Sequence, residues 1–207
     1  MGDVYITKVL KRDATGAIAV AADGSLSSMD LPNGERLRIG NTNPDFTLGW
    51  RNNISWKGLN LSFLINARVG GIVTSETQAV LDQFGVSKAT ADARDRGYVE
   101  VAGGQRVDPQ KYYEVVANQQ LLGYYYYSAT NVRLQNVSLT YTLPKTLLGQ
   151  GWPGITVGFI ANNLWMIYNK APFDPEIAAS TGTYGQGSDY FSAPSLRNIG
   201  FSLKLNF

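Results

Sequence analysis

Several stretches of the chain alternate between apolar and polar residues at every second position. Between residues 45 and 58 the even positions from Phe46 to Trp56 are mostly apolar, and between 58 and 71 the odd positions from Leu59 to Val69 are. Successive side chains of a strand point to opposite faces, so each stretch predicts a strand with one apolar and one polar face. The predicted strands lie near 46–57, 58–69, 131–143, 154–165 and 196–207.

Two local details refine this pattern. Lys57-Gly58 joins the first two strands and is typical of a tight hairpin turn. In 131–143 the apolar positions change from even to odd near Gln135-Asn136, which predicts a β-bulge. The N-terminal stretch DVYITKVL (3–10) is a further strand candidate.

The remaining ranges, 11–44, 70–130 and 166–195, are long and rich in loop-forming residues. Within 70–130 we expect two helices, SETQAVLDQFG and SKATADARDRG, capped by Ser75 and Ser87 and ended by glycines. Short turns that alternate with long connections are typical of a transmembrane β-barrel, with long loops outside the cell.

Alternation alone also fits a soluble β-sandwich. Three further features favour strands that span a membrane. The strands are long enough to cross a bilayer, whereas soluble strands average about 5–6 residues. Aromatic residues lie where girdles are expected, at Phe46, Trp56, Trp165 and Phe207. Charged residues occupy the opposite face, and we expect Arg68, Arg133 and Lys204 to face a water-filled interior.

Composition narrows the function classes. The net charge of +2 does not indicate a nucleic-acid partner. The chain has no Cys and no His, which excludes thiol catalysis, Ser-His-Asp triads and the common zinc sites. Charged residues are only 16% and aromatic residues 12% of the 207 residues, which suits a β-rich protein that faces something other than water. No apolar run is long enough for a membrane helix, and MGDVYITKVL does not fit a signal peptide.

No catalytic group emerges, so we expect neither an enzyme nor a cofactor or metal site. Asp174 and Glu176 could form a glycosidase pair, but a turn around Pro175 is the favoured interpretation. Tyrosines are the candidates for contact with substrate or a covering partner, although girdle or loop packing is the favoured interpretation. These candidates are Tyr124, Tyr125, Tyr126, Tyr127, Tyr184 and Tyr190.

The chain resembles the C-terminal part of SusC/RagA-like TonB-dependent outer-membrane transporters of Bacteroidetes-type bacteria. The resemblance rests on stretches that follow one another in the family's order over most of residues 38–207. They are IGNTNPDFTLGWRNNISWKGLNLSFLINARVGG, ETQAVLDQFGVSKATADARDRG, YYYYSATNVRLQNVSLTYTLPK, NNLWMIYNKAPFDPE and SLRNIGFSLKLNF. Upstream the chain reads KRDATGAIAVAADG where the family often has an acidic D-x-N-x-D-G loop, so the sequence leaves open whether a cation binds there.

The resemblance implies import of bulky nutrients, oligosaccharides or peptides, across the outer membrane. It implies a plugged barrel of about 22 strands, a SusD-like surface lipoprotein as partner, and coupling to TonB through an N-terminal region. About five strands cannot close such a barrel, so we expect residues 1–207 to be a C-terminal portion that supplies all-β antiparallel wall strands and long extracellular loops. A soluble carbohydrate-binding β-module and a passive porin or adhesin barrel remain open alternatives.

Overall fold

The computed structural model describes residues 2–149, 151, 153–176 and 187–206, without the side chains of 119, 120, 122 and 145. The chain divides into two compact units. Unit 1 consists of Met1–Asn43, Gly71–Ser128 and Ile177–Ser192, and unit 2 of Pro44–Gly70, Ala129–Glu176 and Ala193–Phe207.

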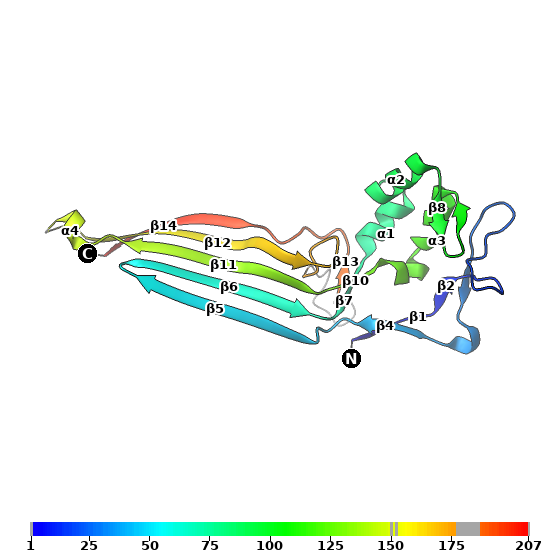
Figure 1. Ribbon diagram of the computed structural model, residues 1–207, viewed down its shortest axis with the longest axis horizontal. Helices are drawn as coiled ribbons and strands as arrows, with labels where there is room; N and C mark the ends of the chain where they lie inside the picture. The colour runs from blue at the N-terminus through cyan, green and yellow to red at the C-terminus, as the bar shows by residue number, and fades with distance from the viewer. Residues whose placement is uncertain (1, 150, 152, 177–186, 207) are drawn as a thin grey trace. The chain divides into compact units, whose positions relative to one another are not determined.

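Unit 2 is a five-stranded antiparallel sheet in the order β14-β12-β11-β6-β5. Figure 1 shows these strands side by side, from cyan β5 to red β14. Their bounds are β5 Phe46–Trp56, β6 Leu59–Val69, β11 Asn131–Thr142, β12 Gly154–Asn169 and β14 Asn198–Asn206. Helix α4, Lys145–Leu148, lies between β11 and β12 in the chain. The strands fall within a few residues of the ranges that alternation predicts.

The hairpin and the bulge are both confirmed. Trp56 pairs with Leu59, and the two turn residues have positive φ, 46° at Lys57 and 87° at Gly58, as a type I′ turn requires. On β11 the pairing with β6 steps from Leu134 directly to Asn136, which leaves Gln135 as the extra residue. The bulge restores the apolar residues of β11 to one face after the change from even to odd positions.

Unit 1 holds short strands in small sheets. Antiparallel pairs form between β1 and β4, between β2 and β3 and between β8 and β9, while β7 pairs with β10 antiparallel and with β13 parallel. The bounds are β1 Asp3–Ile6, β2 Lys8–Leu10, β3 Ser28–Asp30, β4 Leu37–Asn41, β7 Ile72–Ser75, β8 Val99–Val101, β9 Gln105–Val107, β10 Tyr126–Ser128 and β13 Ser188–Asp189.

The two helices predicted from their caps are present. Ser75 accepts a hydrogen bond from the Gln78 N–H at the start of α1, and Ser87 accepts one from the Thr90 N–H at the start of α2. Gly97 ends α2 in the left-handed conformation. The helical segments of unit 1 are η1 Pro32–Gly34, α1 Glu76–Gln83, α2 Lys88–Arg96, α3 Pro109–Val116 and η2 Gln119–Tyr125.

These short elements enclose a hydrophobic core. Residues from two separated parts of the unit 1 sequence, 1–43 and 71–128, supply its buried side chains. They are Leu10, Ile18, Leu26, Ala79, Val101, Val107, Val116, Ala117, Leu121 and Tyr125. Most of the ranges 11–44 and 70–130 therefore belong to a packed unit, which differs from the irregular loops that their composition predicts.

The stretch DVYITKVL does not join the large sheet, because β1 pairs with β4 and β2 with β3 inside unit 1. The strand candidate 3–10 thus forms two short strands, and neither of them is a further strand of the large sheet. Both short strands find their partners within unit 1, with Asp3 opposite Asn41 and Lys8 opposite Asp30. Across the described ranges no helix has the length and apolar character needed to cross a membrane.

Candidate functional site

One face of the five-stranded sheet is apolar over all five strands. Residues paired directly across an antiparallel sheet share a face, so the registers assign each paired position to one face. This apolar face comprises the even positions 46–56 of β5, the odd positions 59–69 of β6, Val132, Leu134, Val137, Leu139 and Tyr141 of β11, the odd positions 155–161, Trp165 and Tyr168 of β12, and the odd positions 199–205 of β14. All are apolar or aromatic except Asn52.

Much of this face is exposed. Trp56 has an exposed fraction of 66% and Phe201 of 86%, while the mid-strand Trp50 has 54%. Trp50 and Phe63 make an edge-to-face contact at 5.6 Å, and Phe159 and Phe201 one at 5.7 Å. An apolar patch of this extent is rare on a soluble monomer and marks a surface with an apolar neighbour.

The predicted girdle residues are placed as follows. Phe46 and Trp56 are the two ends of β5, and Trp56 lies in the same cross-strand row as Tyr141. Trp165 lies in the row of Trp50, through Leu134 and Ile65. Phe207 is outside the described residues. Contact of these aromatic residues with a membrane interface stays a prediction.

The opposite, polar face consists of amides, hydroxyls, glycines and a few charges, with Leu64, Ile160 and Met166 as its apolar members. It comprises the odd positions 47–55 of β5, the even positions 60–68 of β6, Asn131, Arg133 and the even positions 136–142 of β11, the even positions 154–162, Met166 and Asn169 of β12, and the even positions 198–206 of β14. Side chains bond across it, with Asn136 Nδ2 donating to Asn162 Oδ1 at 2.6 Å and the Thr142 and Thr156 hydroxyls 3.0 Å apart.

Arg133 does not line an open surface, contrary to the sequence prediction. Its exposed fraction is 3%, and its guanidinium lies 2.7 Å from Asp174 Oδ1 and 3.4 Å from Glu176 Oε2. Ser195 Oγ accepts a further bond from Arg133 at 3.3 Å. The FDPE stretch does form a turn, since the Glu176 N–H donates to Asp174 Oδ1 at 3.1 Å. The same turn places the carboxylates of Asp174 and Glu176 beside the buried guanidinium of Arg133.

The ionisation of Asp174 follows from this cluster. Burial acts to raise the pKa of Asp174, but hydrogen bonds from Ser195, Arg133 and the Glu176 N–H together outweigh it and hold the pKa below its usual value. The Asp174 carboxylate is paired with Arg133, so it is not available as a general acid or base. A small hollow of about 190 Å³ beside it is lined by Arg133, Asn163, Trp165, Met166, Asp174, Ser195 and Arg197.

The four consecutive tyrosines have different environments. Tyr124 is 44% exposed, whereas Tyr125 is 4% exposed and belongs to the core of unit 1. Tyr126 and Tyr127 lie on β10 opposite Thr74 and Val73, and Tyr127 packs against the core. Tyr190 is 54% exposed and contacts Phe191 edge to face, while Tyr184 is outside the described residues. Contact of the tyrosines with substrate stays a prediction, and Tyr125 offers it little surface.

Tyr125 has an internal role that the sequence does not reveal. Its hydroxyl donates to Asp82 Oδ2 at 2.9 Å, and Gln78 Nε2 donates to Asp82 Oδ1 at 2.7 Å. Asp82 is itself 5% exposed, and these two bonds compensate for the burial of its charge. Burial, followed by the negative charge of Asp82, raises the pKa of Tyr125 far above its usual value.

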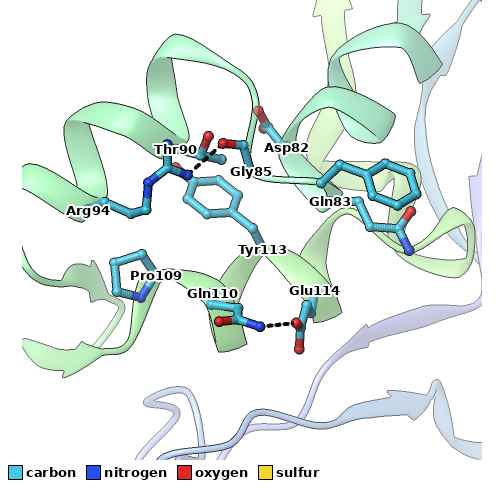
Figure 2. A pocket seen from close by; sticks show the side chains of 10 residues that line it. Asp82, Gln83, Gly85, Thr90, Arg94, Pro109, Gln110, Tyr113 and Glu114 are labelled. Carbon is cyan, nitrogen blue, oxygen red and sulfur yellow. Dashed lines mark hydrogen bonds between the residues drawn. The ribbon is translucent and has the colours of Figure 1, made fainter.

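Unit 1 also carries a pocket of about 310 Å³ between the α1–α2 turn, α2 and α3, at the small end of ligand-binding pockets. Figure 2 shows Tyr113 of α3 pointing towards Thr90 and Arg94 of α2. Arg94 donates to the Gly85 carbonyl at 2.5 Å, and Gln110 donates to Glu114 at 2.7 Å. The polar groups at its wall are therefore largely engaged with one another, and they offer no paired acid and base.

In the region where the family often has an acidic loop, the aspartate side chains accept hydrogen bonds from neighbouring residues. Asp13 Oδ1 accepts bonds from the Thr15 hydroxyl at 2.6 Å and from the Thr15 N–H at 2.8 Å. These bonds, the Thr15 hydroxyl foremost, lower the pKa of Asp13. Among the residues that the structure covers, no group of three or more His, Cys, Asp or Glu side chains could hold a metal ion.

Comparison with curated proteins finds two TonB-dependent receptors of Formosa agariphila. The chain is 26% identical over 201 residues to TonB-dependent receptor P3, which covers 94% of the chain and 19% of the receptor. It is 27% identical over 214 residues to TonB-dependent receptor P39, which covers 100% of the chain and 20% of the receptor. The chain thus spans about a fifth of the length of these relatives. No family model matches the chain.

Comparison with solved structures finds the same fold in part of a larger protein. The RagAB peptide importer in its closed-closed state superposes on the whole chain with a TM-score of 0.62 at 20% identity, over 22% of the importer chain. For its open-open state the TM-score is 0.63 at 21% identity, again over the whole chain and 22% of the importer chain. The resemblance to TonB-dependent receptors and the antiparallel β-fold are thereby confirmed. In the described residues the sheet is open, with β5 and β14 at its edges.

Proposed function

We propose that this chain forms part of the wall of an outer-membrane β-barrel that imports bulky nutrients with energy supplied through TonB. The apolar face of the sheet contacts lipid, and the polar face borders the aqueous interior. The relatives that support this role are named as receptors and as a peptide importer, and none of these names describes an enzyme.

The observation that carries the proposal is the apolar face itself. It continues across all five strands without a charged residue, while every strand charge lies on the other face. From Phe46 to Trp56 the chain advances ten residues, which at about 3.3 Å per residue and about 40° tilt rises roughly 25 Å, the height of the apolar band of such barrels.

The remaining parts of the proposal concern the whole transporter. Its substrate is an oligosaccharide or a peptide, its partner on the cell surface is a SusD-like lipoprotein, and TonB acts through a region outside these 207 residues. The support is the likeness to the TonB-dependent receptors, and to the RagAB importer for the fold. Unit 1, with its own core, supplies the loop region of the wall segment.

Two neighbouring residues at the middle of β6 provide a matched test. Ile65 lies on the apolar face and Leu64 on the polar face, so Ile65→Lys and Leu64→Lys remove similar aliphatic side chains. For the chain folded into lipid vesicles, we expect Ile65→Lys to lower the free energy of unfolding by about 2–4 kcal/mol and Leu64→Lys by less than about 1 kcal/mol. Denaturant titration followed by circular dichroism measures both.

The same chain in plain buffer separates the alternatives. If the chain is a monomer that melts cooperatively without lipid or detergent, and if it tolerates both lysine variants equally, the proposed function is wrong. The soluble β-module would then be the favoured interpretation. Equal losses for both variants in lipid would contradict the assignment of the faces. A passive porin or adhesin shares the same face, and the absence of a plug and TonB-binding segment from the parent gene would identify it.

A further inference from the structure

The segment Gly187–Phe191, which we call the strap, lies against β7 and the start of α1 in unit 1. It contains the two-residue strand β13, which pairs in parallel with β7 and places Ser188 opposite Thr74. The Thr74 N–H donates to the Gly187 carbonyl at 2.7 Å. The strap therefore adds a third, very short strand to the β7–β10 pair, although it lies far from both strands in the sequence.

Polar contacts attach the strap to the first turn of α1. Ser188 Oγ donates to Glu76 Oε1 at 2.7 Å, and the Phe191 N–H donates to Thr77 Oγ1 at 2.7 Å. Among the described residues, none of those that form the hydrophobic core of unit 1 comes from the strap. Because the strap places no side chain in the core, its departure leaves no cavity there. Detachment of the strap therefore does not require unfolding of unit 1.

Asp189 is the buried side chain of the strap, with an exposed fraction of 5%. Its Oδ2 accepts a hydrogen bond from the Ser75 hydroxyl at 3.0 Å. Ser75 is also the N-cap of α1, and its oxygen accepts a bond from the Gln78 N–H at 3.1 Å. Within the described part of the chain no cation forms an ion pair with Asp189. The Ser75 hydroxyl and the partial positive charge at the start of α1 therefore compensate for the burial of this carboxylate.

We propose that Gly187–Phe191 is a detachable strap, which leaves β7 and α1 while the rest of unit 1 stays folded. The hydrogen bond between Ser75 and the Asp189 carboxylate holds it closed. A segment with few hydrogen bonds and no side chain in the core belongs to the least stable part of a domain. In the open state the outer edge of β7 and the start of α1 are exposed to solvent. The opening involves unit 1 alone and is independent of the proposed function.

One buried hydroxyl beneath this contact favours opening. Thr74 is 6% exposed, and its hydroxyl has no hydrogen-bond partner among the residues that the structure describes. A buried hydroxyl without a partner destabilises the state that buries it. Thr74 lies directly opposite Ser188, so opening removes one of the two strands that flank Thr74 and admits water to its hydroxyl.

The strap also carries two exposed aromatic rings. Tyr190 and Phe191 contact each other edge to face at 5.2 Å, and their exposed fractions are 54% and 55%. The bond from the Phe191 N–H to Thr77 fixes the backbone of this pair in the closed state. The state of the strap therefore decides where unit 1 presents these two rings.

Hydrogen exchange of the full 207-residue chain in detergent micelles tests the proposal. The Thr74 and Phe191 N–H groups report on the strap, because both donate across its contact with β7 and α1. The N–H of Ala117, a core residue at the end of α3, reports on unfolding of unit 1. After correction for intrinsic rates, we expect the strap reporters to exchange at least about a hundredfold faster than Ala117 and to depend only weakly on denaturant.

Asp189→Ala tests what holds the strap closed. It removes the carboxylate that accepts from Ser75, so we expect exchange at Thr74 and Phe191 to become at least about tenfold faster, with no change at Ala117. Asp92→Ala is the matched control, because Asp92 is an exposed carboxylate on α2, and it should leave all three rates unchanged.

A disulfide across the contact gives the converse test. Thr74→Cys combined with Ser188→Cys places thiols on directly opposite residues, whose Cα atoms lie about 4.8 Å apart, within the range that a disulfide spans. The chain contains no other cysteine. We expect oxidation to slow exchange at Phe191 at least about tenfold and reduction to restore it.

Three results would overturn the proposal. Equal rates at Thr74, Phe191 and Ala117, with the same dependence on denaturant, would mean that the strap leaves only when unit 1 unfolds. In Asp189→Ala, unchanged exchange at the strap, or an equal rise at Ala117, would contradict the role of the carboxylate in a local opening. Equal exchange at Phe191 in the oxidised and reduced double-cysteine chain would show that the strap does not open there.

Discussion

At the scale of single residues, the buried Arg133 shows how one cation ties separate parts of unit 2 together. Asp174 and Glu176 follow β12, and Ser195 precedes β14, yet all three contact a side chain of β11. Breaking a buried ion pair by removing one partner is costly, because the other charge stays buried. For Asp174→Asn we expect unit 2 to lose roughly 3 kcal/mol at neutral pH, with a smaller loss for Glu176→Gln, whose side chain is more exposed.

The pH dependence of this cluster has a definite sign. The folded pKa of Asp174 lies below the usual value of 3.8, so its stabilising contribution is complete above about pH 4 and is lost as the pH falls through the folded pKa. Melting of the wild-type chain in detergent should therefore fall more steeply below about pH 4 than melting of Asp174→Asn. Parallel curves for the two proteins would show that Asp174 contributes nothing to acid sensitivity.

Arg133 also marks a limit of sequence reasoning. The FDPE turn and the strand position of Arg133 are both visible in the sequence, but Arg133 and Asp174 are 41 residues apart. Only the folding of the chain after β12 brings them together, so no local pattern indicates the ion pair. Tyr125 is a similar case, since its partner Asp82 lies 43 residues earlier.

At the scale of elements, periodicity predicts well wherever a strand or helix is long. Alternation over ten or more residues places the strands of the large sheet, and serine caps with terminal glycines place α1 and α2. The three-residue strands β3, β8 and β9 are too short to show a period, so the sequence predicts their ranges as loops. β8 and β9 place Val101 and Val107 in the unit 1 core, whereas β3 is exposed along its length and pairs with β2.

In the β5–β6 turn we expect substitutions at two adjacent positions to change the stability of the sheet in opposite directions. Gly58 has φ of 87°, and a Cβ there would lie 2.8 Å from the Thr142 carbonyl oxygen, so Gly58→Ala should destabilise the sheet by about 1–3 kcal/mol. Lys57 is a non-glycine residue with φ of 46°, and Lys57→Asn should stabilise it by up to about 1 kcal/mol.

Denaturant titration in detergent measures both variants. Gly149→Ala is the matched control, since Gly149 has φ of 79° but no atom within 4 Å of an added Cβ. It isolates the backbone strain from the contact with Thr142. Losses of the same size at Gly58 and Gly149 would show that the contact has no part in the effect.

At the scale of the whole molecule, the large sheet ends at two strands whose outer edges have no partner in the described residues. An open edge presents free backbone N–H and C=O groups and invites pairing with another chain. Because the chain has no cysteine, engineered thiols report such pairing without background. We expect Asn53→Cys on β5 combined with Asn198→Cys on β14 to give oxidised dimers in micelles.

Ser138→Cys is the control for this experiment, because it lies on the same polar face but on the central strand β11. It should give few dimers under the same oxidising conditions, as judged by non-reducing electrophoresis. Equal yields from edge and centre would mean that contacts between chains are not made through the strand edges.

The β7–β10 pair has a consequence for how fast the sheet can form. β6 ends at Val69 and β11, its neighbour, begins at Asn131, a separation that slows folding by the entropy of closing a long loop. Within the insertion, however, Ile72 pairs with Ser128. Once that pair has formed, the ends of the insertion are already together, and β6 and β11 meet as if joined by a short hairpin. For a loop of this length the entropic saving is roughly 2 kcal/mol, so folding of the insertion before the sheet is the faster order.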